Sequence, residues 1–165
     1  MVMPTIVRTV VILGTILALG PSASAQSLNQ GTFSGVFGWY FPPEQFIQVE
    51  TGHVVWGGTA RGAFRSDGGS DFLHGAGVVC SAAGQFKGGS LTHNGGDCVA
   101  TDKDGDKAVL TWRCTDCPTS RSGTLELTSG TGKYKGISGR GVYQETAAQP
   151  GSGWSVWKGE WKLPD

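Results

Sequence analysis

Large aromatic side chains, with a few polar residues among them, are the residues of this 165-residue chain best suited to bind another molecule. The sequence contains 6 Trp, 7 Phe and 3 Tyr, and small-molecule pockets are walled mostly by apolar and aromatic groups with a few polar ones. The candidate ligand-binding residues are Trp39, Trp56, Arg61, His74, Trp112, Glu145 and Trp157. We expect an apolar or aromatic ligand, with the histidine, the arginine or the glutamate as its polar contact. The alternative is that the aromatic side chains fill the interior of the domain.

The four cysteines predict two disulfides, because an even number in an exported chain indicates disulfide pairing and the first 25 residues predict export. Four cysteines can form two disulfides in three different pairings, and all three are open. We favour Cys80–Cys98, since one residue ends a predicted strand and the other opens a strand two elements later, which leaves Cys114–Cys117 as a local staple. A redox C-x-x-C pair would sit at a helix N-terminus, whereas residues 118–123 are typical of a loop. A four-thiolate zinc site would need a second C-x-x-C. The redox pair and the zinc site remain alternatives to the two disulfides.

The acidic run Asp102-Lys103-Asp104-Gly105-Asp106 has the composition of a calcium loop but not its spacing. Such a loop requires Gly at its sixth position and Glu at its twelfth, and those positions hold Lys107 and Arg113 when counted from the first aspartate. A hairpin turn at the Asp-Gly pair explains the residues better, with a weak calcium site as the alternative.

No catalytic motif is recognisable in the chain. It contains no G-x-S-x-G, P-loop or H-E-x-x-H sequence, and His53, His74 and His93 lack the short spacing of metal ligands. We therefore assign no catalytic residue, no metal and no cofactor. Lys and Arg number 13, as do Asp and Glu, so the charge balance predicts no nucleic-acid partner.

The first 25 residues predict a cleaved signal peptide. Arg8 supplies the positive region, residues 9–19 form a short apolar stretch, and Ala23-Ser24-Ala25 is a small-residue cleavage site. The apolar stretch is shorter than the about 20 residues that a membrane-spanning helix needs. The prediction is a periplasmic or secreted protein with no membrane span, whose mature part, residues 26–165, is one domain.

Glycine and the alternation of side chains indicate an all-β domain. The chain holds 28 glycines, and short runs broken by Gly, Asn or Asp every 8–12 residues are typical of a barrel or a sandwich. Asn94-Gly95-Gly96 predicts a hairpin turn. One face of the run 107–113 presents Ala108, Leu110 and Trp112. The predicted strands are 32–41, 46–50, 53–64, 71–80, 85–93, 97–101, 107–113, 123–128, 136–146 and 154–163.

These elements are enough to close a single antiparallel β-barrel of roughly eight strands, calycin-like in architecture. The most specific segment is Ser129-Gly130-Thr131-Gly132-Lys133-Tyr134-Lys135-Gly136-Ile137-Ser138-Gly139-Arg140-Gly141. Its first two glycines suit a turn with positive φ, and its last three suit bends or close packing in a curved sheet.

This segment resembles the G-G-T-G-x-[FY]-x-G-[AI]-x-G signature of the allene oxide cyclase and dirigent-like barrels, with Ser129 in place of the first glycine. The run 98–107 is similar to the C-x-x-x-D-x-D-G-D-K hairpin of small exported bacterial members of that superfamily. The resemblance implies an eight-stranded barrel with a central cavity, often in a homo-oligomer. Plant members cyclise an epoxide or steer radical coupling with residues outside these motifs, so no functional residue is carried over.

Three functions are compatible with these features of the sequence. The first is an exported barrel that binds a small apolar or aromatic molecule or serves assembly at the cell envelope. The second is a cyclase or isomerase acting on an apolar substrate inside the barrel, and the third is a structural module with a filled core. A cavity of about 300 Å³ or more would exclude the third, and a buried acid or histidine with a shifted pKa in that cavity would favour the enzyme.

Overall fold

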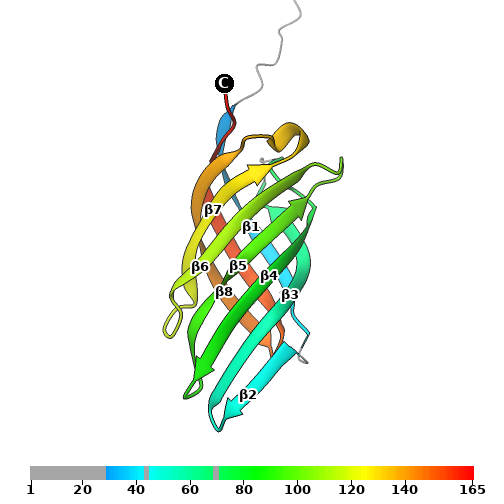
Figure 1. Ribbon diagram of the computed structural model, residues 1–165. Helices are drawn as coiled ribbons and strands as arrows, with labels where there is room; N and C mark the ends of the chain where they lie inside the picture. Colours follow the sequence, from blue (N-terminus) through cyan, green and yellow to red (C-terminus); the bar gives the residue numbers. More distant parts are fainter. Residues whose placement is uncertain (1–28, 43–44, 69–70) are drawn as a thin grey trace, which may run out of the picture.

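The computed structural model describes residues 29–42, 45–68 and 71–165, and the predicted signal peptide lies outside them. The described chain is built almost entirely of strands, in keeping with its glycines and alternating residues (Figure 1). The elements are β1 (Gln30–Tyr40), β2 (Phe46–Glu50), β3 (His53–Ser66), β4 (Ala76–Lys87), β5 (Ser90–Thr101), β6 (Lys107–Asp116), β7 (Ser122–Gly130), the short 3₁₀ helix η2 (Gly132–Tyr134), β8 (Ser138–Gln149) and β9 (Ser152–Lys162).

The strands form a closed antiparallel barrel. Their order is β1-β9-β8-β7-β6-β5-β4-β3-β2, and pairing between β1 and β3 closes the sheet. The long strand β3 pairs with β1 through residues 61–66 and with β2 through residues 53–56. Eight strands therefore complete the barrel, and β2 extends one side of it beyond the end of β1. The predicted all-β, eight-stranded antiparallel barrel is confirmed.

The predicted hairpin at Asn94-Gly95-Gly96 is wrong, because these residues lie inside β5. The turn between β4 and β5 is instead made by Gly88 and Gly89, whose φ angles of 58° and 80° suit glycine. Gly96 has a different role: a Cβ there would overlap the carbonyl oxygen of Ser81 on β4. The glycines of β5 thus allow close approach between strands, which is a use that sequence patterns do not distinguish from a turn.

The disulfide prediction is confirmed for both pairs. Cys80 on β4 lies directly opposite Cys98 on β5, with 3.9 Å between their Cα atoms. Cys114 pairs with Cys117 across the end of β6. The expectation that two elements separate the first pair is wrong, since β4 and β5 are neighbours. All four thiols are used, so the alternative of a four-thiolate zinc site is wrong.

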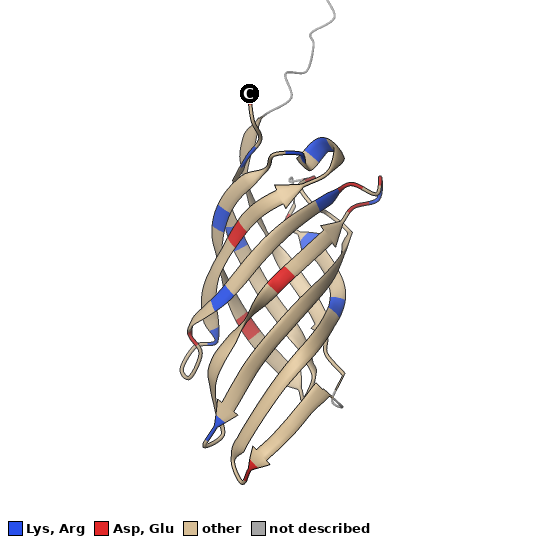
Figure 2. Cartoon of the chain, in the orientation of Figure 1, with Lys and Arg blue, Asp and Glu red and all other residues tan. Residues whose placement is uncertain are grey.

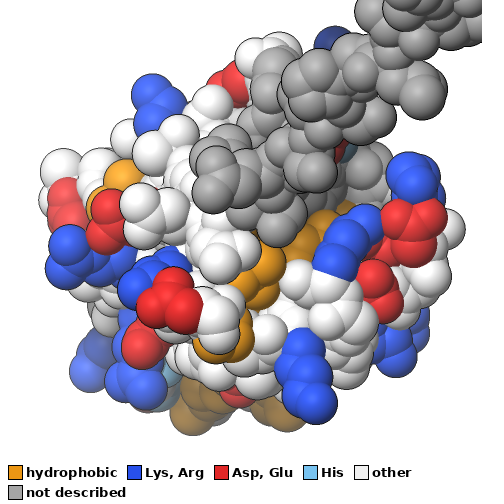
Figure 3. Space-filling view, turned by 90° about the horizontal axis from the view of Figure 1, so that it is seen from above, with side chains coloured by type: hydrophobic (Ala, Val, Ile, Leu, Met, Phe, Trp, Pro, Cys, Tyr) orange, Lys and Arg blue, Asp and Glu red, His pale blue; other side chains and the backbone are white. Residues whose placement is uncertain are grey.

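One end of the barrel, which we call the closed end, is filled by packed side chains. Phe72 in the β3–β4 connection stacks on Trp161 of β9 with 5.2 Å between the ring centroids, and its edge contacts Tyr134 of η2 at 5.8 Å. Ile137 is 2% exposed. Charged side chains of both signs surround a hydrophobic centre in the view onto this end (Figure 3).

The glycine-rich segment connects β7 to β8 at the closed end. Gly132 and Gly136 have φ angles of 53° and 75°, which side chains other than glycine rarely adopt. Further along, a Cβ at Gly139 or Gly141 would overlap a backbone oxygen of β9. The predicted close packing is thus found at Gly139 and Gly141, whereas positive φ occurs at Gly132 and Gly136 and not at Gly130.

Lys and Arg are interspersed with Asp and Glu on the barrel surface (Figure 2). Within the described residues, no helix has the length and apolar character needed to cross a membrane.

Candidate functional site

The half of the barrel interior away from the closed end holds a cavity of about 470 Å³. It forms because small inward-facing residues, among them Ala60, Cys80, Ala82 and Cys98, occupy the middle of β3, β4 and β5. The cavity extends to the end of the barrel where the β4–β5 and β8–β9 hairpins turn, and the exposed residues 148–150 are part of its rim. We call this end the open end. The alternative of an interior filled throughout is therefore wrong for this half of the barrel.

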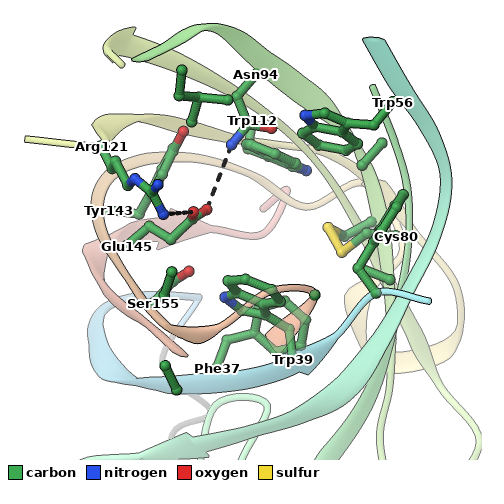
Figure 4. A pocket seen from close by; sticks show the side chains of 18 of the residues that line it. Phe37, Trp39, Trp56, Cys80, Asn94, Trp112, Arg121, Tyr143, Glu145 and Ser155 are labelled. Atoms are coloured by element: carbon green, nitrogen blue, oxygen red, sulfur yellow. Dashed lines mark hydrogen bonds and ion pairs between the residues drawn. A yellow bond between two sulfur atoms is a disulfide. The ribbon is translucent and has the colours of Figure 1, made fainter. Parts of the chain in front are cut away.

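Aromatic rings form most of the cavity wall (Figure 4). Phe41 contacts the ring of Trp56 edge to face at 5.0 Å between centroids, and Trp112 contacts Tyr143 in the same way at 5.7 Å. Trp157 stacks on Phe64 at 5.3 Å, with Phe64 on the side toward the closed end. Such edge-to-face and stacked contacts hold the rings in place. The wall is therefore a preformed aromatic surface.

Three polar side chains form one corner of the cavity, which we call the polar corner: Asn94 of β5, Arg121 before β7 and Glu145 of β8. The Arg121 guanidinium lies 3.7 Å from Glu145 Oε1, and Asn94 Nδ2 donates a long hydrogen bond of 3.5 Å to Oε2 (Figure 4). The side chain of the glutamate is 13% exposed. One carboxylate thus faces one cation and one amide inside a mainly aromatic space.

The backbone also fixes the polar corner. Arg121 has a φ of 50°, an uncommon value for a residue with a side chain. Its carbonyl oxygen accepts a hydrogen bond of 3.0 Å from the N–H of Glu145, so the two residues are joined by main chain as well as by charge. Ser120 accepts a second bond, from Gln144 Nε2 to its carbonyl at 2.7 Å. The β6–β7 loop and β8 therefore hold the ion pair together.

Burial changes the acidity of two groups beside this corner. It raises the pKa of the Glu145 carboxyl above its ordinary value of 4.5, although Arg121 and Asn94 act in the opposite direction. It also raises the pKa of the Tyr143 phenol, with a further contribution from the negative charge of Glu145. The carboxyl consequently holds its proton at a higher pH than an exposed glutamate would.

Five of the seven predicted binding residues line the cavity: Trp39, Trp56, Trp112, Glu145 and Trp157. Arg61 does not, because its neighbour Ala60 faces inward and alternation along β3 turns Arg61 to the outer surface. His74 does not either: it lies in the β3–β4 connection at the closed end, with its Nδ1 2.8 Å from Ser66 Oγ. The structure therefore does not bring these two residues together with the other five.

The sequence prediction missed Asn94, Arg121 and Tyr143. Tyr143 carried a usable signal, since it stands two residues from Glu145 and so shares its face of β8. Asn94 was assigned to the hairpin that does not exist. Arg121 lies in an irregular loop, where no periodicity indicates the direction of a side chain.

The acidic run at the closed end forms the expected turn, with Gly105 at a φ of 85°. Lys133 of η2 places its Nζ 2.6 Å from Asp102 Oδ2 and 2.8 Å from Asp104 Oδ2. This ammonium group, together with backbone N–H donors, lowers the pKa of Asp102 to about 2. No group of three or more metal-ligating residues forms within the described part of the chain. The carboxylates therefore brace the β5–β6 turn against η2.

No family model and no curated protein matches this chain. Among solved structures, the chain is similar to the pterocarpan synthase dirigent protein GePTS1, with a TM-score of 0.47 and 11% sequence identity over 85% of this chain and 90% of that chain. The eight-stranded barrel assigned to this chain rests on its own strand pairing.

Proposed function

We propose that this protein is an exported barrel that binds a small, mainly aromatic molecule in its cavity, with residues 26–165 as the binding domain after removal of signal peptide 1–25. The observation that carries the proposal is the aromatic cavity of about 470 Å³ with one polar corner. Ligand pockets fall in the range of about 300–1,000 Å³ and combine apolar walls with few polar groups. Two disulfides in one small domain fit an oxidising compartment outside the cytoplasm.

The test is to fill the cavity from one wall and measure the binding of the uncharged fluorescent probe N-phenyl-1-naphthylamine. Ala82 is 7% exposed and lines the cavity, so Ala82→Trp places an indole in the space that a ligand would occupy. We expect the probe to bind the native protein and the dissociation constant to rise by about tenfold or more in the variant, because the apolar contact area is lost.

Ala83→Trp is the matched control, since Ala83 is the next residue of β4 and is exposed on the outer face. It should leave probe affinity unchanged. Thermal unfolding followed by circular dichroism verifies that both variants fold. Equal affinity of the two folded variants for the probe would contradict binding in the cavity.

A second candidate function is acid–base catalysis, as in an isomerase or cyclase, with Glu145 transferring a proton to or from a bound substrate. The raised pKa of this carboxyl favours it, because a general acid or base works best when its pKa is near the working pH. The Arg121 guanidinium would then stabilise negative charge that develops beside the carboxyl.

This candidate predicts a measurable titration. Since the folded protein holds the Glu145 proton at a higher pH than the unfolded chain, the contribution of Glu145 to the free energy of unfolding falls as the pH rises above 4.5. We expect the free energy of unfolding of the native protein to fall relative to that of Glu145→Gln as the pH rises above 4.5. Carbon-13 NMR of the side-chain carboxyl measures the pKa directly. A carboxyl that titrates at 4.5 or below would rule out this role.

A further inference from the structure

The charged groups of the polar corner stand farther apart than hydrogen-bonded partners do. Arg121 Nη1 is 3.7 Å from Glu145 Oε1, and Asn94 Nδ2 is 3.5 Å from the other carboxylate oxygen. A hydrogen bond from nitrogen to oxygen is normally about 2.7–3.2 Å long. The main chain helps to fix this spacing, because Arg121 accepts a 3.0 Å bond from the N–H of Glu145. The guanidinium and the carboxylate therefore retain hydrogen-bonding capacity that their protein neighbours do not use.

These two side chains are also open to a molecule in the cavity. Both line it, and the side chains of Arg121 and Glu145 are 35% and 13% exposed (Figure 4). Several other polar atoms of the wall are covered by protein atoms, namely the indole nitrogens of Trp39, Trp56 and Trp112 and the phenol oxygen of Tyr143. We therefore expect the polar corner, and not the aromatic wall, to make the specific hydrogen bonds to a ligand.

The polar corner offers a donor beside an acceptor. A guanidinium only donates hydrogen bonds, and an ionised carboxylate only accepts them. A ligand that displaces water from such a pair loses affinity unless it replaces both kinds of bond. The two charges are opposite, so a charged group on the ligand would be attracted by one and repelled by the other. The matching group is consequently uncharged and carries a donor and an acceptor side by side.

The spacing distinguishes a hydroxyl from an amide. A hydroxyl oxygen about 2.9 Å from both atoms of the 3.7 Å pair would make its two bonds at an angle of about 80°, which is narrow for an oxygen with tetrahedral geometry. The nitrogen and oxygen of an amide are about 2.3 Å apart, so they can make two nearly parallel bonds. The N–H and the C=O must then share one edge, as in a primary carboxamide or a lactam. A trans peptide bond directs them to opposite sides.

We propose that the ligand is an uncharged, mainly aromatic molecule with a primary carboxamide or lactam group, whose N–H donates to Glu145 and whose carbonyl accepts from Arg121. The proposal rests on the proposed function, because it names the class of molecule that the cavity binds. The aromatic wall holds the body of the molecule. The polar corner selects the amide, since a site that hydrogen-bonds a polar group rejects an analogue that lacks it.

The test compares 2-naphthamide with 2-acetylnaphthalene, in which a methyl group replaces the NH₂, by equilibrium dialysis against the native protein at neutral pH. Without a bond to the amide nitrogen the ketone binds more tightly, because its methyl group is apolar. We expect the reverse, with the carboxamide bound at least about threefold more tightly, since hydrogen bonds to charged groups are stronger than neutral ones. The anion 2-naphthoate, which has the same shape, should bind more weakly than the carboxamide.

The polar corner is then removed in Arg121→Met/Glu145→Met, which keeps unbranched side chains at both positions. We expect this variant to prefer the ketone. The matched control is Arg140→Met/Glu160→Met, which removes an ion pair of 2.8 Å between two exposed side chains on the outer face of β8 and β9. It should keep the preference for the carboxamide. Circular dichroism verifies that both variants fold.

The native protein also gives a reading that needs no variant. With ¹⁵N-labelled 2-naphthamide bound, we expect nuclear Overhauser effects between the amide hydrogens of the ligand and the side-chain CH₂ groups of Glu145. A bound carboxamide that lacks these contacts has its amide elsewhere, and this result would overturn the proposal even if the double variant failed to fold.

The outcomes separate this proposal from the one on which it rests. Tighter or equal binding of the ketone by the native protein would overturn the amide ligand, while binding in the cavity stands. Tighter binding of 2-naphthoate would also overturn it, because Arg121 would then act as an unpaired cation. So would a preference for the carboxamide that survives in the folded Arg121→Met/Glu145→Met variant. If none of the three molecules binds and the naphthylamine probe does not bind either, the proposed function itself fails.

Discussion

Replacing Cys80 and Cys98 together by alanine is expected to lower the free energy of unfolding by about 3 kcal/mol. The disulfide joins residues 18 apart in sequence, and it stabilises mainly by restricting the unfolded chain. Both residues are buried, and each alanine leaves a small gap in the wall of the cavity. Urea denaturation followed by tryptophan fluorescence measures the change, with the slope of the transition as a check on two-state behaviour.

The matched control is the double replacement of Cys114 and Cys117. That disulfide closes a separation of only 3 residues, so the same reasoning gives about 1.5 kcal/mol. A larger loss from the second pair than from the first would show that the β6–β7 loop, and not the chain entropy of the unfolded state, controls stability.

Phe64→Ala is expected to destabilise the barrel by about 3–5 kcal/mol, the cost of truncating a fully buried aromatic residue. Phe64 is 1% exposed, and its ring stacks on Trp157, so the change leaves a void between the closed end and the cavity. Domains of this kind are stable by about 5–15 kcal/mol, so the loss is a large fraction of the total. Thermal unfolding by calorimetry measures it.

Tyr40→Ala serves as the comparison, since Tyr40 is 52% exposed at the end of β1 and should cost less than about 0.5 kcal/mol. If the two changes were equally costly, Phe64 would not be the packing link between the filled and hollow halves of the interior.

Much of the fold follows from alternation in the sequence. In β6, Ala108 and Leu110 are buried and Trp112 lines the cavity, as the period of two predicts. The strand 46–50 was predicted with its observed bounds. The predictions that fail concern glycines, because this residue type makes a turn at Gly88 and allows a close contact between strands at Gly96. Only the three-dimensional packing distinguishes the two.

The candidate site was predictable in its aromatic part and not in its polar part. Most large aromatic side chains of this barrel point inward, whether they fill or line the interior, so Trp39, Trp56 and Trp112 could be named from their type. Whether a cavity remains depends on the small residues opposite them. Arg121 reaches that cavity from a loop whose left-handed backbone at one residue has no sequence signature.

Both ends of the described chain lie at the closed end, where the N–H of Leu163 donates a 2.6 Å hydrogen bond to the carbonyl of Asn29 (Figure 1). The cavity is reached from the opposite end of the barrel. A tether attached at Asn29 or at Asp165 therefore holds the molecule by the end opposite the cavity entrance. On a sensor surface, attachment at this end leaves the cavity entrance away from the point of attachment and accessible to dissolved molecules.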